Sequence, residues 1–519
     1  MRTRDRRPAL SSRLRPLAVA LAFAAGSGEV GAVTSYAPGS VPRPPSGGMT
    51  REDGTPLRVA LRAWHEDAAQ NLVPPSPHGL VRQVSNCNDD GPGSLRNVLE
   101  ATASGDTVDL TRLGCSRISL TTGAIAAHID TVTLEGPPSR DLTIDGNNAD
   151  RVFLHYGAGG LLLRNITITR GRHSASGTNV GIAGCLASAG YVTLDHSKVT
   201  GCFASGEGAY GAGIYAYSLI LASSTLSANE AYGTHPDNGT AAFGGGAFVY
   251  QVDIVDSTVT NNVARHRSNP ERTSYDIGGG ILTVRGGLVI DSTIDSNVAG
   301  DRGGGIATFT DILVRNSTIS GNVAGTVGGG GLFVRFPAGL DVRNSTITAN
   351  RAPDGGGVFM TSQNASLLST IVAGNSADPR GVADFAGTRS LTIAGSNNLI
   401  GSTSSVVAIP ADSVTGDPGV MPLAYNGGAT RTHALRSDSP GIDAGNNDAD
   451  LPSDQRGDGY PRVIGASADI GAFEYNDVSP AGSPRAVSVP ALADWACGVL
   501  LALMSIAGAC AAFRRRHRV

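Results

Sequence analysis

Lysine is almost absent from this 519-residue chain, since Lys198 is the single lysine among 40 Lys and Arg residues. Charged residues of all kinds make up only 16%, compared with roughly 25% in an average soluble domain. The arginines gather in the first 32 and the last 24 residues, so the part between them carries a net charge of about −12. An acidic body argues against nucleic acid as a partner and is compatible with cation binding.

Long stretches with the 3.6-residue period of a helix are also missing, which excludes helical repeat proteins. The 70 glycines follow no strict triplet, so the chain is not collagen-like, and 40% hydrophobic residues exclude general disorder. The chain contains instead short segments in which apolar and polar residues alternate, such as 311–315 and 339–343. Alternation of this kind predicts β-strands.

One motif occurs six times between Leu221 and Asn375: Ser-Thr, an aliphatic residue, two small or polar residues, and Asn, with a glycine run following most copies. Its threonines stand at 225, 258, 293, 318, 346 and 370, which are 33, 35, 25, 28 and 24 residues apart. A repeat of this length in strand-forming sequence predicts a parallel β-solenoid with one motif per coil. About nine coils are expected between Thr143 and Thr370.

Equivalent residues of stacked coils lie above one another, roughly 4.8 Å apart. We therefore expect an inward aliphatic stack of Leu226, Val259, Ile294, Ile319 and Ile347. The motif asparagines should form a hydrogen-bonded ladder at a corner where Asn adopts the left-handed conformation; they are Asn229, Asn262, Asn297, Asn322 and Asn350. The glycines should serve a second corner, where positive φ or close backbone approach excludes a Cβ atom.

These repeats resemble the right-handed parallel β-helix proteins with the pectin-lyase fold, and in particular bacterial surface proteins with glycine-rich β-helix repeats. The resemblance implies an all-β fold, and we expect the β-helix to occupy residues 84–398. Ser94 is a plausible N-cap for a short helix with Leu95, Val98 and Leu99 on its apolar face. We expect this helix to cover the exposed first coil. The segment also resembles an entry module found ahead of many bacterial β-helices.

The N-terminus indicates export. Residues 1–32 have a basic region, a nine-residue apolar core and a small-residue end at Ala32, which is the pattern of a signal peptide. A nine-residue apolar core is too short to span a membrane. Residues 33–83 are rich in Pro and Ser and are expected to be a linker.

The C-terminal part leaves the repeat at Leu399. Its strings Ser439-Pro-Gly-Ile-Asp-Ala-Gly445, Asp454-Gln-Arg-Gly457 and Asp469-Ile-Gly-Ala-Phe-Glu-Tyr475 resemble the choice-of-anchor Q domain, so 399–475 is expected to be a C-terminal cap. After a linker at 476–488, residues 489–519 resemble the IPTL-CTERM sorting signals of Gram-negative bacteria. Residues 496–513 are apolar or small and are followed by four arginines within 514–518, which predicts one transmembrane helix with a cytoplasmic end.

Four of the six cysteines lie in the region expected to be exported. We predict the disulfides Cys87–Cys115 and Cys185–Cys202, because oxidising compartments favour them. Zinc is the weaker interpretation, since neither pair has metal-site spacing or neighbouring histidines.

Two long inserts distinguish the coils of Asn229 and Asn262. From the ladder asparagine to the next glycine run there are 15 and 16 residues in these coils, but 6, 6 and 5 in the later ones. The inserts should lie side by side, and long corners on a rigid scaffold either bind ligands or are simply tolerated. The ligand-binding candidates are Glu230, Tyr232, His235, Asp237, Arg265, His266, Glu271, Arg272 and Tyr275.

No catalytic residue is predicted. Of the motifs typical of polygalacturonase-like enzymes only an Asp-Asp pair occurs, at Asp89-Asp90, within the N-terminal cap. Asp195, His196 and Lys198 alternate along one predicted strand and are more typical of a solvated face than of a site. The acids of the cap make calcium possible, although no known calcium-binding spacing is present, and no cofactor or metal site is predicted.

Two classes of function remain open. The first is a non-catalytic, adhesin-like surface protein that binds carbohydrate or protein, and the absence of catalytic motifs favours it. The second is a secreted polysaccharide lyase or glycoside hydrolase that acts at the long-insert corner. Both imply an exported protein of the cell envelope, outer surface or periplasm, whose other partners are the export and sorting machinery and the membrane.

Overall fold

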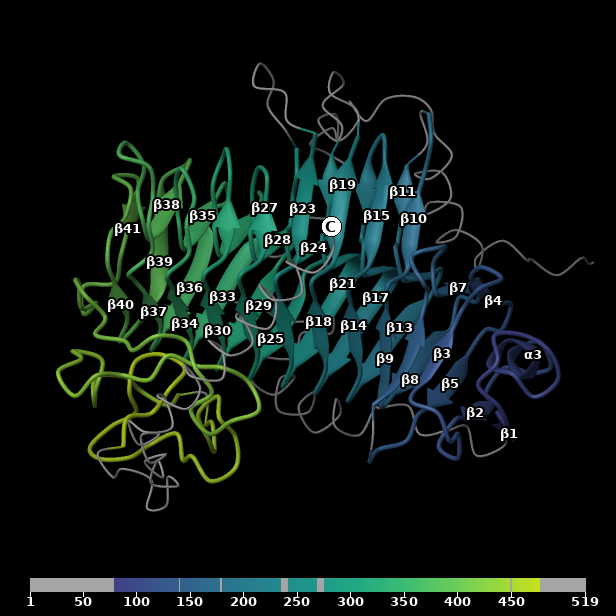
Figure 1. Cartoon of the computed structure of the whole chain (residues 1–519). Coiled ribbons are helices and arrows are strands. Elements are labelled where there is room, and N and C mark those ends of the chain that lie inside the picture. The colour runs from purple at the N-terminus through teal and green to yellow at the C-terminus, as the bar shows by residue number, and fades with distance from the viewer. Residues whose placement is uncertain are drawn as a thin grey trace, which may run out of the picture. The chain divides into compact units, whose positions relative to one another are not determined.

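The computed structural model describes residues 79–476, except 140, 178–179, 235–240, 268–274 and 449. All strands of the repeating region pair in parallel, and each strand pairs with its equivalent in the neighbouring coil (Figure 1). The predicted parallel β-helix is therefore confirmed. Eleven coils are present, and nine of them lie between Thr143 and Thr370, as the motif spacing predicts. Parallel crossovers of this kind are right-handed.

An eleven-stranded sheet forms one side of the solenoid. Its strands are β3 (Arg117–Ser119), β6 (Leu142–Asp145), β9 (Ile166–Thr169), β14 (Lys198–Thr200), β18 (Thr225–Ser227), β22 (Thr258–Thr260), β26 (Thr293–Asp295), β30 (Thr318–Ser320), β34 (Thr346–Thr348), β37 (Ile371–Val372) and β40 (Leu399–Ile400).

The other main sheet consists of two ladders that merge in the nine-residue strands β17 (Ile214–Ala222) and β21 (Ala247–Val255). The first ladder also contains β4 (Ile125–Ala127), β7 (Phe153–His155), β12 (Leu186–Ser188), β24 (Ile281–Thr283), β28 (Ile306–Thr308), β32 (Leu332–Val334), β35 (Val358–Met360) and β38 (Phe385–Gly387). The second ladder also contains β1 (Val81–Gln83), β2 (Thr107–Asp109), β5 (Val132–Glu135), β8 (Gly160–Arg164), β13 (Tyr191–Asp195), β25 (Gly287–Ile290), β29 (Ile312–Arg315), β33 (Gly339–Arg343), β36 (Asn364–Leu368), β39 (Leu391–Ser396) and β41 (Val407–Ala408).

Two smaller sheets extend one corner of the coils and together form what we call the arm. The six-stranded sheet contains β10 (Arg172–Ser174), β15 (Phe203–Gly206), β19 (Glu230–Gly233), β23 (Val263–His266), β27 (Val298–Ala299) and β31 (Val323–Ala324). The three-stranded sheet contains β11 (Gly181–Ile182), β16 (Ala209–Tyr210) and β20 (Ala242–Phe243). Strands β10, β15, β19 and β23 lie side by side at the top of Figure 1.

The predicted aliphatic stack and asparagine ladder are both confirmed. Leu226, Val259, Ile294, Ile319 and Ile347 are fully buried and in register. Each ladder amide Nδ2 donates to the Oδ1 of the next asparagine at 2.9 Å. The ladder ends on Asp384, whose Oδ1 accepts from Asn375, and begins at Cys202, whose backbone N–H donates to Asn229.

The predicted conformation of the ladder asparagines is wrong. The residue before each asparagine has the positive φ instead, for example 53° at Ala228 and 58° at Ala349. The asparagine is thereby free to direct its amide along the stack. The glycine corner agrees with prediction, because Gly244 has a φ of 63° and a Cβ on Gly245 would lie 2.4 Å from backbone oxygens of the neighbouring strands.

The N-terminal cap helix is confirmed as α3 (Leu95–Glu100). Ser94 accepts a hydrogen bond from the Asn97 backbone N–H, and Leu95 and Leu99 join the solenoid core. The predicted linker ends too late, because β1 lies within residues 33–83 and pairs with β2. Both predicted disulfides are confirmed, with Cα–Cα distances of 6.4 Å for Cys87–Cys115 and 5.5 Å for Cys185–Cys202.

The predicted end of the solenoid at residue 398 is wrong. Strand β40 continues the eleven-stranded sheet, and Leu399 forms a bridge with Val414. Residues 415–475, which we call the lateral segment, run back along the outer face of this sheet instead of covering only its last coil. Hydrogen bonds join them to coils from β40 back to β26. In the coils from β18 to β34 the outward threonines of the motif strands gave no sign of a covering segment. In the last two coils the outward residues are the apolar Ile371 and Leu399, which pack against Leu435 and Ile470 of the lateral segment.

The strings that resemble the choice-of-anchor Q domain hold the lateral segment together. The guanidinium of Arg456 pairs with Asp454 at 2.6 Å and lies between the rings of Tyr460 and Phe473. Glu474 is fully buried and accepts from the backbone N–H groups of Ile464 and Asp469. Gln455 reaches out of this network and bonds to Thr293 and Thr318 of the solenoid.

No helix among the described residues is long and apolar enough to cross a membrane. The predicted spanning segment at 496–513 lies outside the described residues, as do the signal peptide at 1–32 and the linker and sorting segment at 477–519.

Candidate functional site

The described ends of the two predicted long inserts lie in the arm, side by side as expected. Glu230–Gly233 pairs in register with Val263–His266. The expectation that only these two coils are enlarged is wrong, because β10 with β11 and β15 with β16 build the same corner in the two preceding coils. The missed strands are short, and their glycine runs are degenerate in sequence.

The arm has its own core, made only of alanine. Ala204, Ala231 and Ala264 of the six-stranded sheet pack with Ala209 and Ala242 of the three-stranded sheet, and all are fully buried. Because strand residues alternate between faces, this core places Glu230, Tyr232 and Arg265 on the outer face of the arm.

Three of the candidate residues come together on that outer face. Arg265 pairs with the Glu230 carboxylate at 2.7 Å, and its guanidinium lies 5.4 Å from the centre of the Tyr232 ring. Each charge therefore already has a partner within the arm. Four other candidates, His235, Asp237, Glu271 and Arg272, lie outside the described residues.

The remaining two candidates lie at the base of the arm. His266 Nδ1 contacts the Asp276 carboxylate at 2.5 Å, and Tyr275 lies beside Arg302, whose guanidinium carbon is 6.0 Å from the ring centre. Arg302 also pairs with Asp301 at 2.7 Å. Sequence reasoning missed Asp276 and Asp301, because single aspartates before glycine runs carry no recognisable signal.

Asp276 and Asp301 resemble a catalytic pair only superficially. Burial raises the pKa of both carboxyls, but every carboxylate oxygen already accepts a hydrogen bond. Asp276 accepts from the Ala242 N–H and from His266, while Asp301 accepts from Thr326 and Arg302. Both side chains are fully buried. This network fastens the arm to the solenoid, and burial keeps both carboxylates away from solvent.

A second candidate region lies at the corner between the first and second ladders. Tyr156, Tyr191, Tyr217 and Tyr250 occupy this corner in four coils in order, and we call them the aromatic row. Tyr156 is 51% exposed and Tyr191 is 47% exposed. Sequence reasoning missed the row, although seven of the 12 tyrosines fall between residues 191 and 275.

A periodic signal for this corner is present in the sequence. Tyr217, Tyr250 and Arg285 each stand eight residues before a motif threonine, at 225, 258 and 293. In the structure the ring of Tyr217 stacks on Tyr250 with 5.4 Å between centres, and Tyr191 meets Tyr217 edge to face at 5.9 Å. Stacking of this kind helps to align coils. Tyr156, at the N-terminal end of the row, also stacks on a ring of the preceding coil, that of His128, with 4.6 Å between ring centres.

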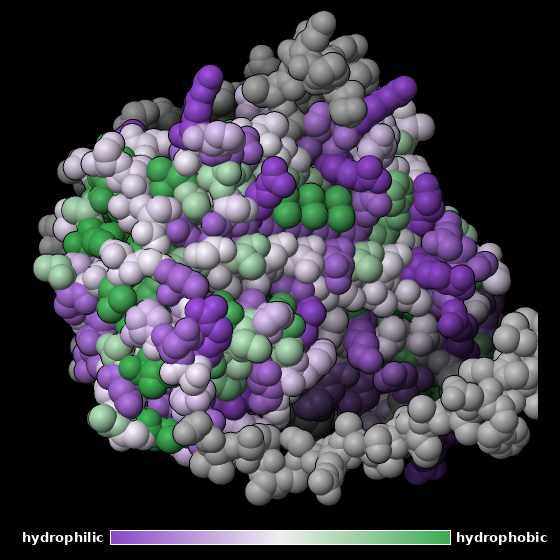
Figure 2. Space-filling view, turned by 60° about the vertical axis from the view of Figure 1, so that its left-hand side comes forward, coloured by the Kyte–Doolittle hydropathy of each residue, from purple (hydrophilic) through white to green (hydrophobic). Residues whose placement is uncertain are grey.

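Toward the C-terminus the same corner carries arginines next to aromatic rings. Arg285 lies 5.9 Å from the Tyr250 ring centre, Arg335 lies 5.1 Å from Phe309, and Arg389 lies 4.8 Å from Phe336. We call these the arginine pairs. On the face shown in Figure 2, hydrophobic residues form small separate patches among polar ones, so that face offers no broad apolar surface.

Two other polar groups considered in the sequence are structural. Although burial opposes ionisation, bonds from Arg96, Thr121 and Thr122 hold the pKa of Asp89 far below its usual range. The trio of Asp195, His196 and Lys198 does not share one strand, because His196 forms a corner with a φ of 48° between β13 and β14.

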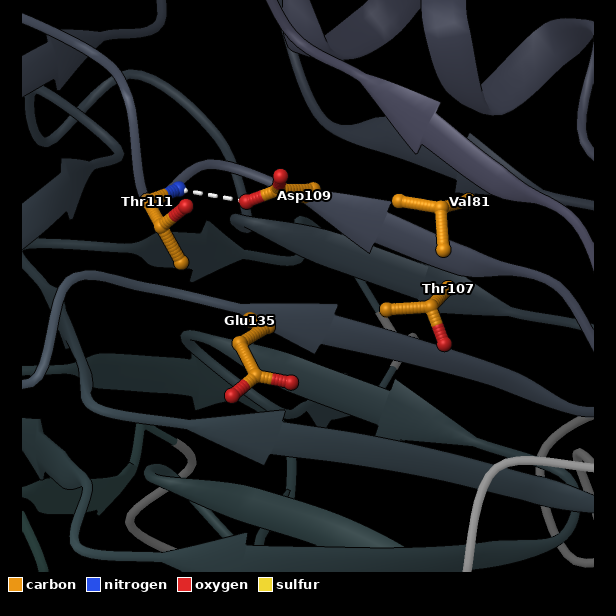
Figure 3. Close-up of a pocket in the computed structure, with 5 residues that line it drawn as sticks. All are labelled: Val81, Thr107, Asp109, Thr111 and Glu135. Carbon is orange, nitrogen blue, oxygen red and sulfur yellow. Dashed lines mark hydrogen bonds between the residues drawn. The ribbon is translucent and has the colours of Figure 1, made fainter.

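No group of three or more His, Cys, Asp or Glu side chains suited to a metal ion occurs among the described residues. A hollow lies on the outer face of β1, β2 and β5 and is lined by Val81, Thr107, Asp109, Thr111 and Glu135 (Figure 3). Its Asp109 accepts from the Thr111 N–H at 2.8 Å, and Glu135 faces Arg164 at 3.9 Å. We assign no activity to this hollow.

The comparisons with known proteins add little beyond the fold. No protein-family model matches the chain, and no curated protein matches it. Among solved structures, the crystal structure of pectate lyase Pel9A is similar with a TM-score of 0.39 and 12% identity, over 77% of this chain and 98% of that chain. The strand pairing itself is therefore what shows that this chain is a parallel β-helix.

Proposed function

We propose that this protein is an exported, non-catalytic, adhesin-like β-helix of a bacterial cell envelope that binds carbohydrate or protein. Its export would rest on the signal peptide at 1–32, and its retention on the tail at 489–519, which resembles IPTL-CTERM signals. Residues 399–475, which include the lateral segment, would be its choice-of-anchor Q domain. These parts are proposals from the sequence patterns.

The observation that carries the binding role is the aromatic row. Four tyrosines repeat at one corner, two of them about half exposed, on a scaffold whose stacked coils fix their positions. Exposed tyrosine rings give both an apolar face for sugar rings and a hydroxyl for hydrogen bonding. The outer face of the arm, with Glu230, Tyr232 and Arg265, is a second surface that a protein ligand could use.

A glycan array probed with the full-length protein tests this proposal. We expect binding that falls at least tenfold in the variant Tyr191→Ala/Tyr217→Ala and is unchanged in Tyr425→Ala, whose ring is 70% exposed in the lateral segment. Wild-type binding that is insensitive to the tyrosine substitutions would remove the row from the proposal. Absence of any glycan or protein ligand would remove the binding role itself.

The enzymatic alternative is tested in parallel by reducing-sugar release and by absorbance of unsaturated products on the bound glycans. We expect no release, because the carboxylates of Glu230, Asp276 and Asp301 are all paired. Release that disappears in Glu230→Gln, with folding intact, would replace the binding role by a lyase or hydrolase acting at the arm.

A further inference from the structure

We propose that the outer face of the six-stranded sheet in the arm is an interface between two copies of this chain, which meet face to face with their rods antiparallel. The proposal gives a partner to the outer face of the arm, which the proposed function leaves open to a protein ligand, and it rests on that function for this surface alone. The aromatic row is not involved, because it lies at another corner of the solenoid.

Three valines stand one above another on this outer face. Val263, Val298 and Val323 are in register in β23, β27 and β31, and the alanine that follows each of them is buried behind the sheet. Alternation along the strands therefore turns the valines outward. Val298 is 36% exposed, and the other two are partly exposed. We call these residues the valine stripe; β23 and β27, which carry two of them, are neighbours in Figure 1.

Charges of opposite sign stand at equal distances from the centre of the valine stripe. Counted from Val298 in the same outward column, Glu230 lies two coils toward the N-terminus and Arg351 two coils toward the C-terminus. Two coils correspond to roughly 10 Å. Arg265 uses only Oε1 of Glu230, so Oε2 accepts no hydrogen bond from a described residue. Arg351 is exposed and has no ion pair within the described part of the chain.

A two-fold axis that runs along β27 in the plane of the interface exchanges these positions. It places Val298 against Val298 of the second copy, and Val263 against Val323 of the second copy. It also places Glu230 opposite Arg351 of the second copy. Contacts between unlike residues occur twice, because an interface of this symmetry is isologous. The face therefore complements itself, with apolar contacts at the centre and an ion pair at each end.

The tallest side chain beside the valine stripe also meets an open position. Arg265 stands two residues after Val263, and the equivalent residues of the next two coils are Gly300 and Gly325. The same axis places Arg265 opposite Gly325 of the second copy, where no side chain obstructs it. Since Arg265 is already held by Glu230 and the Tyr232 ring, it loses little conformational freedom when the two faces meet.

The interface is small. From Glu230 to Arg351 it spans four coil spacings, roughly 19 Å, whereas a stable complex usually buries about 800 Å² on each partner. We therefore expect a weak dimer whose population depends on protein concentration. Retention of many copies in one membrane through their tails would raise the effective concentration and favour pairing.

Sedimentation equilibrium of the full-length protein in non-ionic detergent, over a range of concentrations, tests the inference. We expect the average mass to rise from that of a monomer toward that of a dimer. Val298→Lys places two ammonium groups at the axis and should weaken association at least tenfold. Its matched control is Val406→Lys, which changes a valine that is 38% exposed and lies next to β41. The control should associate like wild type.

The ion pairs are tested separately. Arg351→Glu should weaken association about tenfold, because one substitution turns both ion pairs of the isologous interface into contacts between acids. The exchange variant Glu230→Arg/Arg351→Glu should restore association to within threefold of wild type. Arg112→Glu makes the same charge change at an exposed residue between β2 and β3 and should have no effect. Circular dichroism checks that each variant is folded.

Cross-linking locates the axis. In the background Cys497→Ser/Cys510→Ser, Val298→Cys alone should form a covalent dimer with a short bismaleimide, because this residue faces itself. Val263→Cys and Val323→Cys should each react poorly alone and well when the two variants are mixed. Cross-linking of Val263→Cys alone that equals that of Val298→Cys would overturn the proposed arrangement.

A monomeric mass at every concentration would overturn the inference. Association that Val298→Lys and Arg351→Glu leave unchanged would also overturn it, because that result would assign the contact to another surface. Either result leaves ligand binding by the aromatic row intact. Failure of the proposed function is a different result, namely no binding to any glycan or protein ligand on the array.

Discussion

The same sequence motif serves two different surroundings in the eleven-stranded sheet. In β18 and β22 the outward threonines Thr225 and Thr258 are partly exposed, whereas Thr318 and Thr346 in β30 and β34 are at most 1% exposed. The lateral segment makes the difference, because it bonds to the outward hydroxyls of β26, β30 and β34 and packs apolar side chains on Ile371 of β37 and Leu399 of β40. The motif therefore fixes the inner core, and the covering chain decides what the outer residues do.

The asparagine ladder should respond alike in the covered half of the sheet, from β26 to β40, and in the uncovered half before it, because the ladder lies inside the solenoid. Asn262→Ala and Asn322→Ala each leave two donors of the preceding asparagine without an acceptor. Each N–H group left without an acceptor costs about 1–3 kcal/mol, so we expect the free energy of unfolding of each variant to fall by roughly 4 kcal/mol. Urea unfolding monitored by circular dichroism measures this loss.

Asn261→Gly, at an exposed position with positive φ, should be close to neutral. A much smaller loss for Asn262→Ala than for Asn322→Ala would contradict the expectation that the ladder stabilises both halves equally.

A rise in pH should weaken the lateral segment of the covered half. Burial raises the pKa of Glu474 to about 7 from 4.5, and burial also raises the pKa of Asp469. The folded state holds the Glu474 proton more tightly than the unfolded state, so its contribution is complete below pH 4.5 and is lost as the pH rises to about 7. We expect the lateral segment to lose about 3 kcal/mol of stability over this range. Hydrogen exchange of 415–475 against pH measures it.

In Glu474→Gln the pH dependence of that exchange should flatten, while exchange in β18 and β22 stays unchanged. A slope that persists in the variant would assign the effect to another group, with Asp469 the first to examine.

Gln455 is the clearest single link between the lateral segment and the solenoid. It is buried and bonds to Thr293, Thr318 and Thr430. Gln455→Ala should destabilise the covered half by about 2 kcal/mol, since hydroxyls lose their partners in a dry interface. Limited proteolysis of the segment should show faster cleavage. Gln251→Ala, at an exposed residue of β21, is the matched control and should behave as wild type.

The smallest expected effect distinguishes the halves most directly. Thr318→Val removes a hydroxyl that donates to Gln455 at 2.6 Å and should cost about 1 kcal/mol. Thr258→Val changes the equivalent residue in the uncovered half and should be neutral or slightly stabilising, because valine favours strands. Differential scanning calorimetry compares the two. Equal losses would mean that the hydroxyl matters to the coil itself.

Much of the scaffold could be predicted from the sequence because its determinants are local and repeated. The aliphatic and asparagine positions recur within each motif, and the helix cap at Ser94 is a local signal. The position of the lateral segment could not be predicted, because it depends on contacts between residues such as Thr293 and Gln455, 162 positions apart. Nothing in either local sequence encodes that pairing.

The candidate site was predictable only in part. The inserts were visible as changes in spacing, and Glu230, Tyr232 and Arg265 do lie together. Asp276 and Asp301 were invisible because their role comes from burial, which single residues do not reveal. The aromatic row was within reach, since Tyr217, Tyr250 and Arg285 keep a constant distance from the motif. The row becomes apparent only when the residues that precede each motif are compared between repeats, and not the motif residues alone.

The path of the lateral segment has a mechanical consequence. In an ordinary solenoid, tension on the C-terminal end peels off the last coil, one pair of hydrogen bonds at a time. Here the chain leaves the fold beside Gly471 and Ala472, which bond to Ser369 and Thr346 in earlier coils. A pull from that end is therefore shared as shear across several coils at once. A molecule under load from its own tail would hold its rod together under forces that would unzip an uncovered one.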